Sequence, residues 1–160
     1  MAGGRLQHEI KKRRPFDSLE QQAILNLHCT SDQIQFCFTR LSRRHGLTRS
    51  QYNILRILRG VGKPLAIVEI ANRMIAVASG ITGLIDRLEG MGLATRERST
   101  EDRRVIFVAI TDKVLRLLAG LVEPVMELHR RVAAKLSPAE LKEVFRLLEK
   151  GRQPIAPEVE

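Results

Sequence analysis

Tryptophan is absent from this chain of 160 residues, and aromatic residues make up only 4% of it. Proteins that bind single-stranded nucleic acid stack bases on aromatic side chains, so this scarcity argues against RNA or single-stranded DNA as the partner. The chain also lacks an apolar run long enough to span a bilayer. No apolar stretch follows its basic first fifteen residues, as one would in a signal peptide. We therefore expect a cytoplasmic protein.

Cysteines and catalytic groupings are scarce as well. Cys29 and Cys37 lie eight residues apart in a helical pattern, which puts them about 12 Å apart along the axis, too far for a disulfide within the helix. Each is a small buried apolar residue, which we favour, a redox sensor, or a thiol that bridges to the other subunit. The four histidines show no zinc-ligand spacing with the cysteines, and no phosphate-binding glycine loop or Ser-His-Asp arrangement is recognisable. We expect no catalytic residue, no metal site and no cofactor.

Acidic residues are missing from residues 33–68, although the whole chain carries a formal charge of +9. That segment holds seven cations, namely Arg40, Arg43, Arg44, Arg49, Arg56, Arg59 and Lys63. A local surplus of this size favours a polyanionic partner, whose phosphates would lie near several of these side chains. The alternatives for any one arginine are a solvated face or an acid of a partner chain. The candidate phosphate contacts are Arg43, Arg44, Arg49 and Lys63.

Residues 67–110 carry the most informative pattern, which predicts a helix-turn-helix followed by a hairpin. Ile70, Met74, Ile81 and Leu84 are apolar where two crossing helices must pack. The second helix is expected over residues 78–89, with its apolar stripe on one side. The opposite face is small or polar and holds Ser79, Gly80, Thr82, Gly83, Asp86 and Arg87. Such a face would let the helix lie deep in a DNA groove.

Two strands are expected after Gly92, over residues 94–98 and 104–110, with a turn at residues 99–102 between them. An arginine at the tip of such a hairpin suits the narrow, negatively charged minor groove of DNA. One observation weighs against DNA. The predicted recognition helix carries Asp86 and Glu89 against Arg87 alone, so its net charge is slightly negative.

Long amphipathic helices flank this motif. Apolar positions recur at helical spacing over residues 17–44 and again after Thr111, which we expect to cap the later helix. Thr48 and Ser137 are further expected caps. Because the end helices have no apolar partner within the motif, packing them against a second copy would bury both stripes. A two-fold dimer would place its recognition helices ~34 Å apart, as a pseudo-palindromic DNA site requires. A monomeric bundle is the less favoured alternative.

The chain resembles the MarR family, the multiple-antibiotic-resistance type of bacterial transcription regulator. The resemblance is carried by Gly46-Leu47-Thr48, residues 51–55, residues 62–65, residues 82–89, Gly92-Leu93, Asp102-Arg103-Arg104 and Ile110-Thr111. It implies a homodimer whose second motif helix enters the major groove and whose wing arginines enter the minor groove. It also implies release from DNA by a small molecule or a redox signal, for which Cys29 and Cys37 are candidates.

The resemblance also implies roles for individual residues. Ser79, Thr82 and Arg87 would contact bases or phosphates, Arg103 or Arg104 would occupy the wing tip, and Asp102 would orient these arginines. An effector pocket between the dimer helices and the DNA-binding core would be lined by His28, Tyr52 and Arg56. A buried tyrosine and a surface histidine are the simpler explanations for two of these.

The chain departs from the family pattern at two helix starts. Ala66 and Val77 stand where a polar cap is usual, and neither side chain can accept a bond from a free N–H. Gly80 and Gly83 each lower helix propensity by about 1 kcal/mol relative to alanine. The recognition helix would therefore be ordered in part by DNA.

We expect a mainly α fold with a small β-hairpin wing (α+β): a winged helix-turn-helix core with N- and C-terminal dimerisation helices. The expected segments are a basic mobile tail (1–16), a helical dimerisation region (17–46 and 112–151), a DNA-binding domain (47–111) and a C-terminal tail (152–160). The expected function is a sequence-specific regulator of transcription, a repressor that binds double-stranded DNA. The alternatives are a helical protein-protein adaptor with a degenerate winged motif and a sequence-neutral architectural DNA binder.

Overall fold

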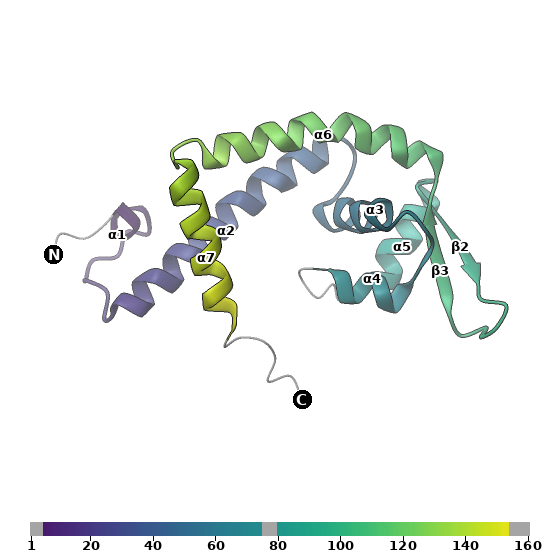
Figure 1. The fold of residues 1–160 in the computed structure, drawn as a ribbon, viewed down its shortest axis with the longest axis horizontal. Coiled ribbons are helices and arrows are strands. Elements are labelled where there is room, and N and C mark those ends of the chain that lie inside the picture. Colours follow the sequence, from purple (N-terminus) through teal and green to yellow (C-terminus); the bar gives the residue numbers. More distant parts are fainter. Residues whose placement is uncertain (1–4, 75–79, 154–160) are drawn as a thin grey trace. The chain divides into compact units, whose positions relative to one another are not determined.

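A computed structural model describes residues 5–74 and 80–153 of the chain. The elements in chain order are α1 (Arg5–Glu9), α2 (Leu19–Arg44), α3 (Arg49–Val61), β1 (Leu65–Ala66), α4 (Ile67–Arg73), α5 (Ile81–Gly90), β2 (Ala94–Arg98), β3 (Ile106–Ile110), α6 (Asp112–Ala133) and α7 (Pro138–Arg152). They divide into two compact units, Met1–Leu117 and Leu118–Glu160. The winged helix-turn-helix expected from the sequence lies entirely in the first unit (Figure 1).

Helix α3 forms the centre of the first unit and contacts α4, α5 and β3. Ile54 and Leu55 on α3 are fully buried. The inward residues of α4 and α5, namely Ile70, Ile85 and Leu88, are equally inaccessible. On α5 the two buried residues lie three positions apart, and on α3 the buried Leu58 follows Ile54 by four. The stripes that the sequence predicted for these helices therefore form the core that holds the motif together.

The sheet is antiparallel with strand order β1-β3-β2. The hairpin pairs Ala94 with Ile110 and Arg98 with Ile106, as an alternating pattern requires. The short β1 was not predicted, because two residues are too few to show alternation. Strand β3 begins at Ile106 and not at residue 104, since the backbone N–H of Arg104 donates to the Asp102 carboxylate and continues the turn.

Side-chain caps close several helix starts. Thr48 and Ser137 each form a capping box, with Gln51 and Glu140 respectively, as predicted. The backbone N–H of Ser137 lowers the pKa of Glu140, because it donates to the charged carboxylate. The prediction that Thr111 caps α6 is wrong. Its hydroxyl instead donates to the carbonyl of Gly92 at 2.8 Å, just after the C-terminal end of α5.

Helix α5 begins at Ile81, three residues later than the sequence pattern suggested. Gly80 precedes it with φ 83°, a left-handed backbone that is not helical and that favours glycine. Gly92, at φ 67°, ends the helix as predicted, and the next residue, Leu93, donates its N–H back to Leu88 at 2.8 Å. Ser79 and Val77 lie outside the described residues.

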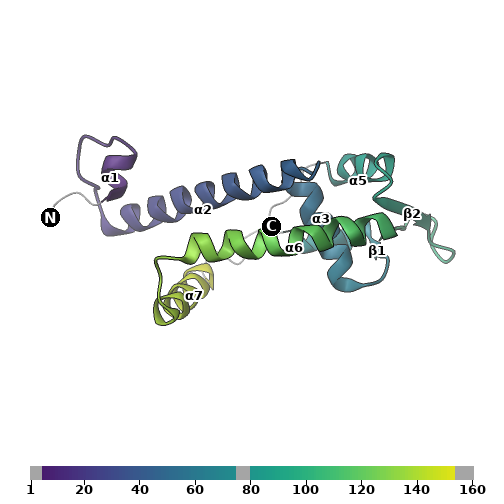
Figure 2. The ribbon, with the colours of Figure 1, turned by 90° about the horizontal axis from the view of Figure 1, so that it is seen from above.

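The basic start of the chain, which we expect to be a mobile tail over residues 1–16, contains a short helix. Residues Arg5–Glu9 form α1, beside the start of α2 (Figure 2), and Leu6 is only 4% exposed. Gln7 Nε2 donates to the carbonyls of Lys12 and Arg14 and so closes the turn that follows. One buried leucine and one glutamine are too weak a pattern to predict from sequence.

Helices α2, α6 and α7 keep apolar side chains exposed. On α2 these are Leu19, Ile24, Leu27 and Phe36, and on α7 they include Leu141, Val144, Phe145 and Leu148. Helix α7 has no buried residue at all. None of the helices in the described part of the chain combines the length and the apolar character needed to cross a membrane. The apolar stripe predicted for α7 is therefore uncovered, and that of α2 is uncovered at Ile24 and Leu27. The stripe predicted for α6 is instead mostly buried, at Val114, Leu118, Leu121 and Leu128, and the apolar side chains that α6 exposes are Leu115, Val122, Met126 and Val132.

We expect Ile85→Ala to lower the free energy of unfolding of the first unit by about 2–5 kcal/mol, because it removes a fully buried side chain and leaves a cavity. Val68→Ala on α4 is the control. Val68 is 69% exposed, so its loss should change stability by about 0.5 kcal/mol or less. Urea denaturation measures both, and equal effects of the two substitutions would contradict the described core.

Candidate nucleic-acid interface

The exposed side of α5 carries two rows of residues. Thr82, Asp86 and Glu89 form one row at helical spacing and are all exposed. Gly83 and Arg87 belong to the other. A Cβ placed on Gly83 would meet no atom within 4 Å, so the fold itself does not demand a glycine there. Its smallness leaves the helix surface open to close approach from outside.

Arg96 on β2 reaches across to the acidic row of α5. One guanidinium nitrogen lies 2.5 Å from the Asp86 carboxylate and donates to the carbonyl of Thr82 at 3.1 Å. Its Nε lies 3.6 Å from the Glu89 carboxylate, which is an ion pair but too long for a hydrogen bond. The Arg96 side chain is 20% exposed, whereas those of its partners are about half exposed. The hairpin thus supplies a cation that spans the recognition helix.

The ion pairs of Arg96 answer the objection to DNA binding that the sequence raised, namely the net negative charge of the predicted recognition helix. The two acids that made the recognition helix slightly negative are both paired with Arg96. Arg87 is exposed and has no ion pair with any residue in the described ranges, so it is the cation that α5 offers to a partner. The charge of α5 has to be counted together with that of the strand beside it.

The wing tip is organised by two short side chains. Ser99 Oγ accepts from the backbone N–H groups of Glu101 and Asp102, both at 3.2 Å. The Asp102 carboxylate accepts from the backbone N–H of Arg104 at 2.9 Å and from its guanidinium at 3.2 Å. The Arg104 side chain is still 91% exposed. Asp102 therefore contacts Arg104 through both its backbone and its side chain. Its expected role in orienting the wing arginines toward DNA stays a prediction.

Arg103 is the other arginine of the tip. It is exposed, and none of the described residues pairs with it. The hairpin consequently presents two exposed arginines. The Arg104 side chain is bound to the Asp102 carboxylate, whereas the Arg103 side chain has no partner among the described residues.

The C-terminal end of α5 is tied to the start of α6. Lys113 Nζ donates to the carbonyl of Met91 at 2.9 Å, next to the bond from Thr111 to Gly92. Carbonyls at a helix end lack partners within the helix and carry partial negative charge, so a lysine is favourable there. A displacement of the first turn of α6 would act directly on the end of α5.

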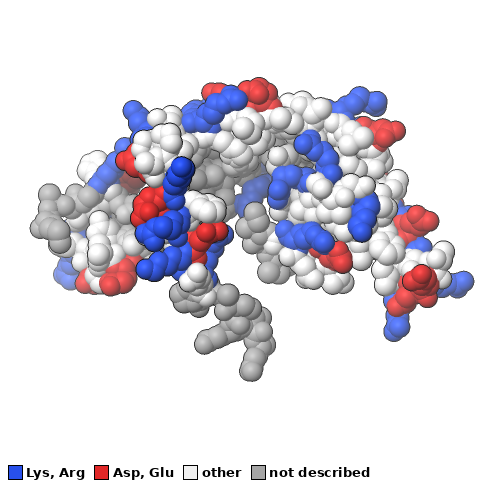
Figure 3. Space-filling view, viewed as in Figure 1, with Lys and Arg blue, Asp and Glu red and all other residues white. Residues whose placement is uncertain are grey.

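The cations of residues 33–68 lie on α2, α3 and the loop after α3. Arg43, Arg44 and Lys63 are exposed, as phosphate contacts must be. Arg49 is half-buried and donates to Gln35 of α2, so part of its capacity is used within the fold. Figure 3 shows basic side chains gathered over the helices of the motif and at the wing tip. Their contacts with phosphates stay a prediction.

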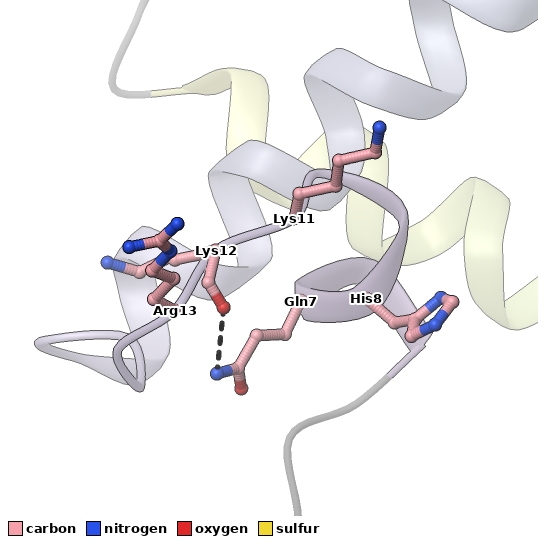
Figure 4. A pocket seen from close by; sticks show the side chains of 5 residues that line it. All are labelled: Gln7, His8, Lys11, Lys12 and Arg13. Carbon is pink, nitrogen blue, oxygen red and sulfur yellow. Dashed lines mark hydrogen bonds between the residues drawn. The ribbon is translucent and has the colours of Figure 1, made fainter.

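The proposed effector-pocket residues are placed on two helices. His28 is exposed on α2, and Tyr52 is half-buried on α3. Arg56 is exposed and donates to Asn53 at 2.9 Å, on the same helix. A surface pocket of about 550 Å³ lies elsewhere, lined by Gln7, His8, Lys11, Lys12 and Arg13 (Figure 4). The effector pocket stays a prediction.

Cys29 and Cys37 are half-buried free thiols on α2. Within residues 5–74 and 80–153, no group of three or more histidine, cysteine, aspartate or glutamate side chains is arranged to hold a metal ion. The redox role of Cys29 and Cys37 stays a prediction.

Three contacts of this interface were missed by sequence reasoning, namely those of Arg96, Lys113 and Gln35. Arg96 sits in an ordinary strand pattern, and its partners lie ten and seven residues earlier on another element. The sequence did hold one signal. Asp86 and Glu89 lie on a helix expected to approach phosphates, and such acids need a cation from a neighbouring element.

Comparison with known proteins gives one consistent result. The model of the MarR family matches residues 47–106. The repressor MdtR of Bacillus subtilis, described as an HTH-type transcriptional repressor, is 31% identical over 138 residues, covering 77% of this chain and 88% of its own. The chain is thus similar to a transcriptional repressor over most of its length.

Solved structures agree. A MarR transcription factor from Planctomyces limnophilus is 44% identical, with a TM-score of 0.66, and the match covers 84% of this chain and 98% of that one. A mutant MarR from E. coli, solved in complex with operator DNA, shares the fold with a TM-score of 0.74 at 19% identity, over 88% of this chain and 100% of that one.

We expect Arg96→Gln to speed amide hydrogen exchange in the first turns of α5 by about two- to tenfold, because the helix loses its bridge to β2. Arg98→Gln is the matched control. It lies on the same strand, is exposed and has no ion pair within the described residues. Exchange measured by mass spectrometry checks both variants, and an α5 that exchanges normally in Arg96→Gln would show that the contact does not hold the helix.

Proposed function

The chain belongs to the MarR family of transcription regulators, and from that premise we propose that it is a homodimeric repressor of a double-stranded DNA operator. In this proposal α5 enters the major groove and the β2–β3 hairpin enters the minor groove. The observation that carries it is the pairing of Asp86 and Glu89 with Arg96. That pairing leaves Arg87 as the cation available on the recognition helix.

The residues proposed to contact DNA lie on the exposed face of α5 (Thr82, Gly83 and Arg87), at the wing tip (Arg103 and Arg104), and before α5 in the sequence (Ser79 and Gly80). Asp102 is proposed to orient Arg104. The exposure of Arg43, Arg44 and Lys63 supports contacts to flanking phosphates, where counterion release adds affinity. Arg49 is a weaker candidate because Gln35 already binds it.

Dimerisation is supported by the uncovered apolar side chains of α2, α6 and α7. Exposed apolar faces of this extent are unusual on a monomer and are typical of an interface between subunits. A closed two-fold dimer would present two recognition helices and two wings to a pseudo-palindromic operator.

Regulation by an effector is proposed from the family alone. MdtR is described as a repressor, and the operator complex belongs to the E. coli protein. We propose that a small molecule or a redox signal releases this chain from DNA, that it has no enzymatic activity, and that it acts in the cytoplasm, where its operator lies.

Selection from a random duplex pool should enrich an inverted repeat with half-sites about one helical turn apart. Affinity for that duplex should fall by about a thousandfold or more between 50 and 200 mM salt, as expected for six or more phosphate contacts. Fluorescence anisotropy measures both the affinity and its salt slope. An adaptor would ignore duplex DNA at low salt, and an architectural binder would show no preference for the enriched repeat.

Arg103→Ala and Arg104→Ala should each weaken operator binding by about 1 kcal/mol or more and make the salt slope shallower by about one contact. Arg131→Ala is the control, since it removes an exposed cation of α6 that lies outside the winged motif. Sedimentation should find all three variants dimeric. Wild-type affinity in both wing variants would remove the hairpin from the mechanism.

A further inference from the structure

Two methionine sulfurs accept hydrogen bonds from amide side chains of α3. Gln51 Nε2 donates to the Sδ atom of Met91 at 3.6 Å, and Asn53 Nδ2 donates to that of Met74 at 3.4 Å. Met74 is the C-cap of α4 and Met91 is the C-cap of α5. Helix α3 therefore holds both helices of the motif at their C-terminal ends through thioethers, which are weak acceptors.

Met91 is the more exposed and the more connected of the two. Its residue is 37% exposed, so a small oxidant can reach the side chain, and its carbonyl accepts the bond from Lys113. Gln51 on the other side is only 5% exposed, and its Oε1 accepts from the backbone N–H of Thr48 at 2.8 Å. The amide that binds the sulfur is thus fixed, whereas the methionine lies at the surface.

We propose that Met91 is a site of oxidative modification, and that its conversion to the sulfoxide by hypochlorous acid lowers the affinity of the protein for DNA. The oxygen–chlorine bond of hypochlorous acid breaks, the sulfur forms a bond to oxygen, and chloride and a proton leave. The thioether loses two electrons, and chloride carries them away. The effect on DNA rests on the proposed function, but the modification itself does not.

The consequence follows from the space between the two side chains. Oxidation turns a flexible apolar side chain into a polar one with an added oxygen. Where the oxygen forms on the sulfur lone pair that accepts from Gln51 Nε2, it has to fit into the 3.6 Å between these two atoms. Because Gln51 is buried and tied to Thr48, the displacement falls on Met91. Met91 caps α5, so the recognition helix loses the hydrogen bond that joins its C-terminal end to α3.

The test oxidises the full chain with stoichiometric hypochlorous acid and then adds a thiol reductant, which restores reversibly oxidised Cys29 and Cys37 but not methionine sulfoxide. Mass spectrometry locates the sulfoxides, and anisotropy gives the ratio of operator affinity before and after treatment. We expect a loss on the order of three- to tenfold, the equivalent of about one hydrogen bond. Methionine sulfoxide reductases should reverse it.

Variants assign the effect to one sulfur. The loss on treatment should vanish in Met91→Leu. It should persist in Met126→Leu, the matched control, whose residue is 45% exposed on α6 and is outside the winged motif. Full oxidation of Met91 without loss of affinity would overturn the proposal, and so would a loss that persists in Met91→Leu or disappears in Met74→Leu.

A measurement without DNA separates this inference from the proposed function. Oxidation should speed amide hydrogen exchange at the C-terminal end of α5 in the parent chain and in Met126→Leu, but not in Met91→Leu. Unchanged exchange in oxidised parent protein would defeat the inference. Failure of the untreated chain to bind any duplex would defeat the proposed function alone.

Discussion

The bridge from Arg96 to the recognition helix is the contact on which the proposed interface depends. It joins a strand of the hairpin to α5, so that the element proposed for the minor groove and the element proposed for the major groove are held to each other. It also decides which charges a partner meets. Without Arg96, two carboxylates would face any approaching phosphate, and electrostatic repulsion would oppose binding.

The Arg96 bridge orients α5 more than it adds to the free energy of unfolding. Ion pairs with half-exposed carboxylates contribute about 0–1 kcal/mol, because water competes for both partners. The free energy that keeps α5 in place comes from burial of Ile85 and Leu88 against α3. Burial of apolar side chains holds a helix against a surface, but it is not directional and only weakly restrains rotation of the helix about its axis. The directional contacts from Arg96, Gln51 and Lys113 restrain that rotation from β2, α3 and α6.

Two contacts at the C-terminal end of α5 come from the start of α6. Thr111 and Lys113 belong to the beginning of the helix that continues into the second unit. Residues that hold the end of α5 are therefore within one turn of a helix whose further length carries exposed apolar side chains. A change at a subunit interface built on that helix would be transmitted by two hydrogen bonds to the recognition helix.

Periodicity, capping residues and motif spacing determined the fold in advance. The stripe through Ile81, Leu84, Ile85 and Leu88, the Thr48 and Ser137 caps, the glycine after α5 and the Asp102 contact with Arg104 all depend on residues close together in the chain. Local interactions of this kind can be recognised from sequence because their partners lie a few positions apart.

Only the tertiary structure decided what crosses between elements. Arg96 pairs with acids on another element, Thr111 uses its hydroxyl on Gly92 instead of its own helix, and β1 exists only because β3 lies beside it. Left-handed Gly80 likewise moved the start of α5, since a glycine's backbone conformation follows from its surroundings. A side chain can pair only with groups that the fold brings near it. For elements far apart in the sequence, that proximity depends on how the whole chain packs and cannot be recognised in a local stretch of sequence.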